Sequence, residues 1–279
     1  MRSTRIAAVV AGVVMVAGLT ACNGGKSDNA GGNGGGAGSN QSPLEAALAS
    51  LKTASQQVNG KKSAEIDGTQ KVGPSTRTMK GAMDWSNGIN MTLDITMTGG
   101  GQPMGSGKPM KALYTPQAMY MNMGMPMGGK NWIKYDYEML AKQGPAGALI
   151  KDALQNNDPG KSVDLLIASG KVKEAGKEDV RGVQATHYTG TVDVAGLVKM
   201  QSKGLSESDL KALEQQLKQT GATKETIDLW VSSDNLLVKK REQMDGRKAM
   251  DSTVYYSHYG TKVNVTPPPA SDVLTPPAA

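Results

Sequence analysis

The chain of 279 residues contains one cysteine, two histidines and no phenylalanine. A single cysteine cannot form an intrachain disulfide, and it weakens the case for a thiol enzyme or a cysteine-based metal site. The catalytic patterns G-x-S-x-G and H-E-x-x-H are absent, and no Ser/His/Asp order stands out. His187 and His258 both fall within strand patterns, so we expect structural roles for them. These absences predict a protein that is not an enzyme and uses no cofactor or metal.

The N-terminus has the features of a bacterial secretory signal. Arg2 and Arg5 precede an apolar run, Ile6 to Leu19, which is too short and too rich in Gly and Ala for a membrane span. The run ends in LTAC, where small residues precede Cys22. This lipobox resembles bacterial lipoprotein signals, in which the cysteine is diacylated. We therefore expect a signal peptide over 1–21 and a lipid anchor at Cys22 on the extracytoplasmic side of the cell membrane. The alternative is a secreted protein with a chance cysteine at the cleavage site.

A Gly-rich segment follows the cysteine, and 22–42 is predicted to be the acylated residue and a flexible tether. Within it, GNGGGA at 32–37 matches a dinucleotide-binding pattern, but no strand precedes it, so we interpret the match as accidental. The tether would reach roughly 25 Å. Removal of the signal lowers the formal net charge from +6 to +4. This weak positive charge is compatible with anionic lipid headgroups and gives no indication of nucleic-acid binding.

The residues after the tether begin with a helix signal. Ser42 suits the N-cap, Pro43 the first helical position, and Glu45 completes a capping box. The apolar residues of this segment fall on one helical face, namely Leu44, Ala47, Leu48, Leu51 and Val58. The pattern predicts an amphipathic helix that packs on an apolar layer.

Strand patterns dominate the rest of the body, which we expect to be one domain over 43–266. The stretch INMTLDITM alternates, with apolar residues on one face: Ile89, Met91, Leu93, Ile95 and Met97. Such alternation is typical of an antiparallel sheet with one buried face. Helical patterns interrupt the strands between Tyr137 and Gly170, and again from the cap Ser206 to Gly221. One-sided strands with amphipathic helices predict a two-layer α+β fold. Prolines end the last strand, and 267–279 is expected to be a loose tail.

The stretch MYMNMGMPM, Met119 to Met127, has a methionine at every second position. In a strand, Met119, Met121 and Met123 would share one face, with Cα atoms two residues apart separated by about 6.6 Å. Plain core packing is one interpretation. A ligand-cavity wall is another, because methionine adapts to irregular apolar surfaces. A Cu(I) site is the third, since thioethers bind Cu(I), but no His, Cys or acidic residue joins them on the apolar face of the neighbouring strand.

The strand MYMNM is followed by GGKNWIKYD, helices, GVQATHYTGTVDV, a further helix, TIDLWVSSDNLL and YSHYGTKVNVTPPP. In order and spacing these segments resemble the LppX/LprG-type bacterial lipoproteins, which share the LolA/LolB-like fold. The similarity covers most of Pro43 to Val273. It implies a strongly curved antiparallel β-sheet, a half-barrel, with helices packed on its concave face. It also implies an apolar cavity between them for the acyl chains of lipids or lipoglycans. The candidate cavity wall is Met91, Leu93, Ile95, Met97, Met119, Met121, Met123, Leu48 and Leu51.

A basic run, KKR, occupies Lys239, Lys240 and Arg241. It is interpreted either as a solvated hairpin or as a site for an anionic headgroup at the cavity mouth. The resemblance predicts a monomeric, membrane-anchored lipoprotein that binds or transfers lipids. Two alternatives stay open, namely an envelope lipoprotein that docks a membrane protein or sensor, and a Met-rich Cu(I)-binding protein. No nucleic-acid partner is expected.

Overall fold

The structure is a computed structural model that describes residues 42–99, 109–155, 158–193, 221–247 and 249–276, together with positions 207, 211 and 215. The predicted signal peptide, Cys22 and the tether lie outside the described residues. Most of the predicted helix from Ser206 to Gly221 lies outside them as well, and the three described positions within it are helical.

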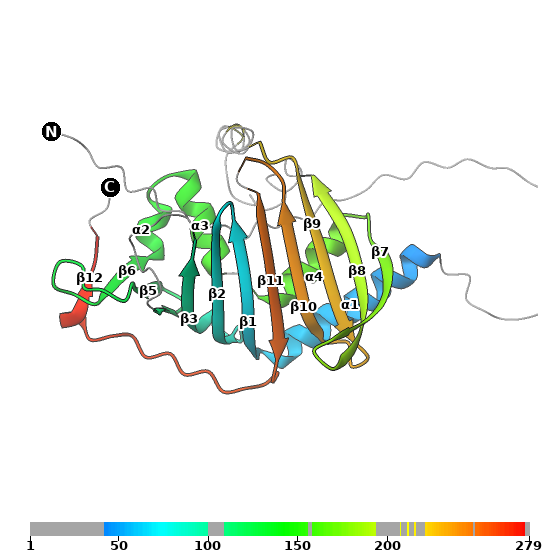
Figure 1. Ribbon diagram of the computed structural model, residues 1–279, viewed down its shortest axis with the longest axis horizontal. Helices are drawn as coiled ribbons and strands as arrows, with labels where there is room; N and C mark the ends of the chain where they lie inside the picture. Colours follow the sequence, from blue (N-terminus) through cyan, green and yellow to red (C-terminus); the bar gives the residue numbers. More distant parts are fainter. Residues whose placement is uncertain are drawn as a thin grey trace, which may run out of the picture.

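One open, curved sheet forms the body of the protein (Figure 1). Its strand order is β12-β6-β5-β4-β3-β2-β1-β11-β10-β9-β8-β7, so the first six strands lie side by side in chain order. The later strands return from β7 to β11, and β11 pairs with β1 in antiparallel register. The strands are β1 (Ser63–Val72), β2 (Ser75–Asp84), β3 (Asn90–Thr98), β4 (Met110–Tyr114), β5 (Ala118–Asn122), β6 (Trp132–Asp136), β7 (Lys173–Val180), β8 (Val183–Asp193), β9 (Lys224–Ser232), β10 (Leu237–Met244), β11 (Met250–Ser257) and β12 (Val273–Leu274).

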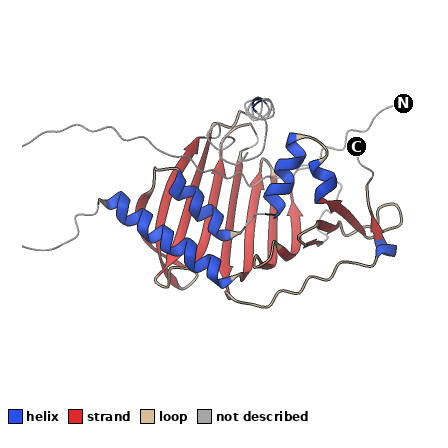
Figure 2. Cartoon of the chain, turned by 180° about the vertical axis from the view of Figure 1, so that it is seen from behind, coloured by secondary structure: helices blue, strands red, loops and turns tan. Residues whose placement is uncertain are grey.

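Among the continuous segments that the structure describes, four α-helices lie on one face of this sheet, which we call the inner face (Figure 2). They are α1 (Pro43–Lys61), α2 (Tyr137–Ala141), α3 (Pro145–Gln155) and α4 (Pro159–Ala168). A short 3-10 helix, η1 (Ala270–Asp272), precedes β12. The α+β class, the curved and mainly antiparallel sheet and the helices packed on its concave side are confirmed.

Helix α1 begins where its cap residues predict. The Ser42 hydroxyl accepts from the Glu45 backbone N–H at 3.3 Å, and the Glu45 carboxylate accepts from the Ser42 N–H at 2.8 Å. The helix ends at Lys61, and Lys62 follows in the left-handed conformation with φ 66°. Its buried face includes Leu51 and Val58, both fully buried. Reciprocal capping thus fixes the start of the helix, and the apolar face holds it on the sheet.

The alternation predicted for β3 is present in the structure. Met91, Leu93 and Ile95 are buried, whereas Asp94 between them is exposed. Because side chains alternate across a strand, this pattern directs every second residue of β3 to the inner face.

The predicted loose tail is wrong for residues 270–274. Val273 and Leu274 form β12, which pairs in parallel register with Trp132 and Ile133 of β6. The Asp272 carboxylate also accepts hydrogen bonds from Asn131, through its backbone N–H and its side-chain amide, each at 2.9 Å. The last long strand, β11, ends at Ser257, so the strand expected to run up to the prolines is absent and 261–269 has no regular secondary structure. The contacts of 270–274 nevertheless attach the end of the chain to the sheet edge.

Candidate functional site

The inner face of β2 to β5 is unusually rich in methionine. The strand register sets Met83 opposite Met91, and Met119 opposite Tyr114, which in turn faces Met91. Pairing through Ala112 places Met121 on the same face. Seven methionines of these four strands therefore share one surface, which we call the methionine floor: Met79, Met83, Met91, Met97, Met110, Met119 and Met121.

The floor is largely shielded from solvent. Met83, Met91, Met110 and Met119 are 3 to 9% exposed, and the other three members are half-buried. Met123 follows β5 and packs against the core. Further along the predicted ladder, Met125 and Met127 are 39% and 37% exposed. Strand β5 ends at Asn122, so Met123 lies just beyond the strand whose face it was predicted to share with Met119 and Met121.

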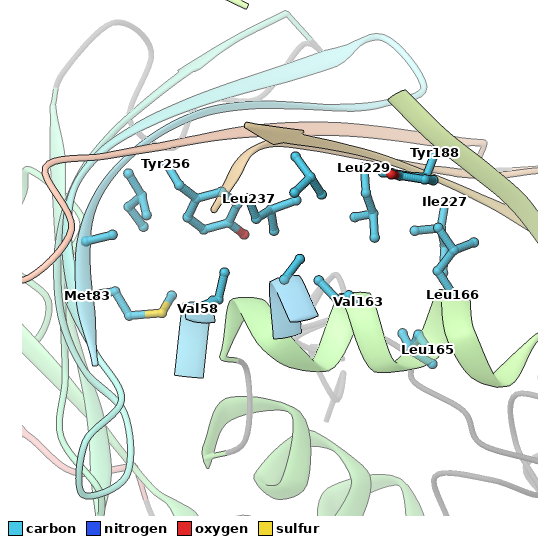
Figure 3. Packing of buried hydrophobic residues seen from close by; sticks show 14 of the residues in the cluster. Val58, Met83, Val163, Leu165, Leu166, Tyr188, Ile227, Leu229, Leu237 and Tyr256 are labelled. Carbon is cyan, nitrogen blue, oxygen red and sulfur yellow. The ribbon is translucent and has the colours of Figure 1, made fainter. Parts of the chain in front are cut away.

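Helices α1 and α4 cover the other half of the inner face, over β7 to β9 (Figure 2). Figure 3 shows Ile227, Leu229 and Leu237 of the sheet facing the side chains of Val163 and Leu166 of α4. All five side chains are buried. This half of the protein is therefore a packed two-layer core.

Two glycines allow close packing in this half of the protein, one between α4 and α1 and the other between β8 and α4. A Cβ on Gly160 of α4 would lie 2.2 Å from Oδ1 of Asn59 in α1, and one on Gly190 of β8 would lie 2.5 Å from Cδ1 of Leu166. The Ser55 hydroxyl adds a 2.7 Å hydrogen bond to Asp164, which joins α1 to α4.

The predicted wall residues of α1 also lie in this layer. Leu51 is fully buried in the same apolar cluster as Met91, Leu93 and Ile95, and Leu48 packs against it, partly buried. Met97 and Met123 are likewise partly buried against the cluster. The structure thus brings the predicted wall residues of β3, β5 and α1 to the inner layer.

Helices α2 and α3 lie beside the methionine floor (Figure 2). Helix α2 contacts β6 and α3, and Lys151 of α3 forms an ion pair with Glu138 of α2. At the end of α3, the Gln155 amide donates to the Pro116 carbonyl at 2.8 Å, next to β5. Asp136 caps α2 by accepting from Glu138 and Met139 backbone N–H groups.

The inner layer also contains a buried polar cluster that the sequence did not reveal. Lys240 Nζ lies 2.9 Å from Glu242 Oε1 and donates to the Ser162 hydroxyl of α4 at 3.0 Å. Glu225 of β9 is 2% exposed beside them. Burial, and then the Glu242 carboxylate, raise the pKa of Glu225 well above its usual range, and Lys240 offsets them only in part. The Glu225 carboxyl therefore favours the neutral form.

The basic run does not form one patch. The register directs Lys240 to the inner face, and Lys239 and Arg241 to the outer face. Lys239 lies over the Trp230 ring, with Nζ 3.6 Å from the ring centroid. Arg241 donates to the Asp251 carboxylate. A joint headgroup site of these three residues is not compatible with this arrangement, and Lys240 is not solvated as a hairpin residue would be.

The histidines occupy different environments. His187 lies on β8, stacked on Trp230, with Nδ1 3.1 Å from Glu178 and Nε2 2.9 Å from Asp228. His258 lies in the turn after β11 with φ 47°, so its predicted strand position is wrong. Among the described residues no group of three or more His, Cys, Asp or Glu side chains is arranged to hold a metal ion.

Three buried side-chain polar atoms of the described residues lack a hydrogen-bond partner. They are Trp85 Nε1, the Tyr137 hydroxyl and Glu225 Oε2. Buried polar groups in native proteins are normally paired with protein or water, so each of these atoms is a candidate contact for something bound. Neither Tyr137 nor Glu225 had a signal in the sequence beyond its place in an alternating segment.

Across the parts of the chain that the structure describes, no helix is both long and apolar enough to span a membrane. The fold of this chain is similar to that of the lipoprotein LppX of Mycobacterium tuberculosis. Its crystal structure covers 79% of this chain and 98% of its own, with TM-score 0.50 and 14% identity. The predicted resemblance to LppX/LprG-type lipoproteins is thereby confirmed at the level of the fold.

Sequence comparison identifies the family. No family model matches the chain. An uncharacterized 31.2 kDa protein from the rplA-rplJ intergenic region of Streptomyces griseus is 43% identical over 240 residues, which cover 81% of this chain and 78% of that protein. The chain belongs to the family of this protein. A Streptomyces coelicolor protein assigned as a lipoprotein is 36% identical over 205 residues, which cover 69% of this chain and 61% of that protein.

Proposed function

We propose that the protein is an extracytoplasmic lipoprotein, anchored through Cys22, that binds lipids by their acyl chains between the sheet and its helices. The observation that carries the proposal is the methionine floor beside α2 and α3, on the inner face of an LppX-like sheet. Flexible thioether side chains can adapt to chains of different shape. Each acyl CH₂ group removed from water contributes about 0.8 kcal/mol to binding.

Catalysis has no part in this proposal. The tether gives the domain access to lipids in the membrane that holds it, and the mature net charge of +4 favours anionic surfaces. The similarity to a Streptomyces coelicolor protein that is assigned as a lipoprotein supports the anchor. The shared fold with LppX supports an inner layer that faces away from water.

Native mass spectrometry of the protein purified from its host membranes tests the proposal. We expect adducts with lipid masses, or uptake of phospholipid after delipidation. Lipid binding would be contradicted if the protein carried no ligand in any spectrum and also failed to bind added phospholipid. It would favour the docking alternative, in which the sheet is a filled scaffold for a membrane protein.

A Cu(I) titration separates the remaining alternative. The methionine floor offers thioethers, which Cu(I) accepts as ligands, but they lie among Leu93, Ile95 and Ala112 within the buried layer. We expect no tight stoichiometric Cu(I) site in isothermal titration with a Cu(I) complex.

A further inference from the structure

Tyr137 carries a buried hydroxyl with no partner beside the methionine floor. The residue is 1% exposed and begins α2 directly after β6. Ile133 and Tyr135 of β6 lie opposite Met121 and Met119, so they belong to the inner face. Tyr137 follows two residues later, and it interacts electrostatically with Tyr114, which also belongs to that face. These relationships place the Tyr137 side chain at the end of the floor.

The phenol is suited to donate a hydrogen bond. Burial, with a contribution from Tyr114, raises the pKa of Tyr137, so the hydroxyl keeps its proton at physiological pH. The neighbouring thioethers are only weak acceptors. A buried O–H without an acceptor is unfavourable, whereas a ligand oxygen next to it would remove that cost.

The distribution of charge on the inner face indicates what kind of ligand oxygen the Tyr137 hydroxyl would contact. Arg77 is the one charged side chain on the inner face of β2 to β5, and it lies opposite Met97. Along β2 it is six residues from Met83, which corresponds to about 20 Å of strand. The Arg77 side chain reaches back toward Tyr114, because its positive charge partly offsets the rise that burial causes in the Tyr114 pKa. An anionic headgroup would be drawn to this guanidinium rather than to the uncharged Tyr137 hydroxyl. A neutral hydroxyl at the Tyr137 end suits an uncharged acceptor.

We propose that the Tyr137 hydroxyl donates a hydrogen bond to the ester carbonyl of an acyl lipid that lies on the methionine floor. This inference rests on the proposed lipid-binding function and adds a specificity to it, namely a preference for ester-linked over ether-linked chains. An ether oxygen is a poorer acceptor and has no carbonyl to offer at the same place.

A matched pair of lipids tests the inference. The full-length protein, stripped of bound lipid, is titrated with dipalmitoyl phosphatidylglycerol and with its dihexadecyl ether analogue. We expect the diester to bind roughly threefold to tenfold more tightly, as one net hydrogen bond provides. In Tyr137→Phe the diester should lose this advantage, whereas the affinity for the diether should stay unchanged.

The control variant is Tyr120→Phe, because Tyr120 pairs with Lys134 and Leu113 on the outer face. It should keep the preference for the diester. Thermal unfolding of lipid-free Tyr137→Phe checks the fold, and its Tm should equal or exceed that of the wild type, since the lost hydroxyl has no partner.

Each other outcome overturns the inference. Equal binding of both lipids by the wild type, or a preference that survives in Tyr137→Phe, removes the role of Tyr137 and leaves lipid binding in place. Binding of neither lipid removes the proposed function and this inference with it.

Discussion

Lys240 Nζ lies 2.9 Å from Glu242 Oε1, and both side chains are at least nine-tenths buried on the inner face of β10. Burial opposes the charge on Lys240, but Glu242 and the other neighbouring acidic groups outweigh it and raise the pKa of Lys240. Taking two charges out of water is costly, and their mutual attraction repays this only when the pair is well formed. Each buried charge of the Lys240–Glu242 pair is therefore compensated by its partner, and removal of either one should destabilise the folded state.

Lys240→Met should lower the free energy of unfolding by about 3 kcal/mol or more, because Glu242 would be left as an uncompensated buried charge. The double variant Lys240→Met/Glu242→Leu should recover most of this loss. Urea unfolding of the wild type, both single variants and the double variant measures the coupling. Additive losses in the double variant would show that the pair is not a unit.

Glu225→Gln should change how stability depends on pH. Burial raises the pKa of Glu225 in the folded protein above its ordinary value of 4.5. The folded state therefore binds more protons than the unfolded state once the pH exceeds that value, and stability falls as the pH rises until the folded pKa is reached. The Gln variant lacks this term, so its stability relative to the wild type should increase as the pH rises above about 5. Unfolding free energies at several pH values measure the difference. Parallel curves would contradict the raised pKa.

Met121→Leu should lower the free energy of unfolding by less than about 1.5 kcal/mol, because the change conserves side-chain volume. Met121→Lys should cost more and reduce lipid loading, since an ammonium group would enter the apolar layer. Tyr120→Lys on the outer face is the matched control and should be tolerated. Stability and lipid loading are measured for all three. A Cu(I) site predicts a different result, in which Leu abolishes metal binding as completely as Lys.

Cys22→Ala should leave the domain folded, because Cys22 precedes the start of α1 at Pro43 by about twenty residues. The variant should lose acylation and accumulate as an unprocessed or shed protein. Membrane fractionation and mass spectrometry of the N-terminus measure this. Recovery of the variant as fully processed protein in the membrane fraction would disprove the lipobox assignment.

Local signals in the sequence were sufficient for several parts of the structure. The capping box located the start of α1, and alternation gave the buried face of β3 and the shared face of Met119 and Met121. These features depend on residues a few positions apart. The two-layer α+β class followed from one-sided strands and amphipathic helices. The strong curvature of the sheet followed from the resemblance, which rests on the order of many segments.

The basic run shows where local reasoning fails. Leu237 is fully buried on the inner face, so strict alternation would direct Lys239 inward as well. The register shifts between Leu237 and Lys239, and this bulge turns Lys240 inward instead. A bulge inserts one residue and so reverses the faces beyond it. Its position depends on pairing with β9, a contact that the sequence of β10 alone does not specify.

The two outer strands of the sheet have consequences for how copies of the molecule meet. An uncovered strand edge offers free backbone groups to any neighbouring chain, and long open sheets are exposed to edge-to-edge aggregation. At one end β12 occupies part of the β6 edge (Figure 1). At the other end, the outermost strand β7 contains many charged residues, including Lys173, Glu174, Lys177 and Glu178. We therefore expect the short C-terminal segment and the charged border to oppose edge-to-edge pairing between copies of the molecule.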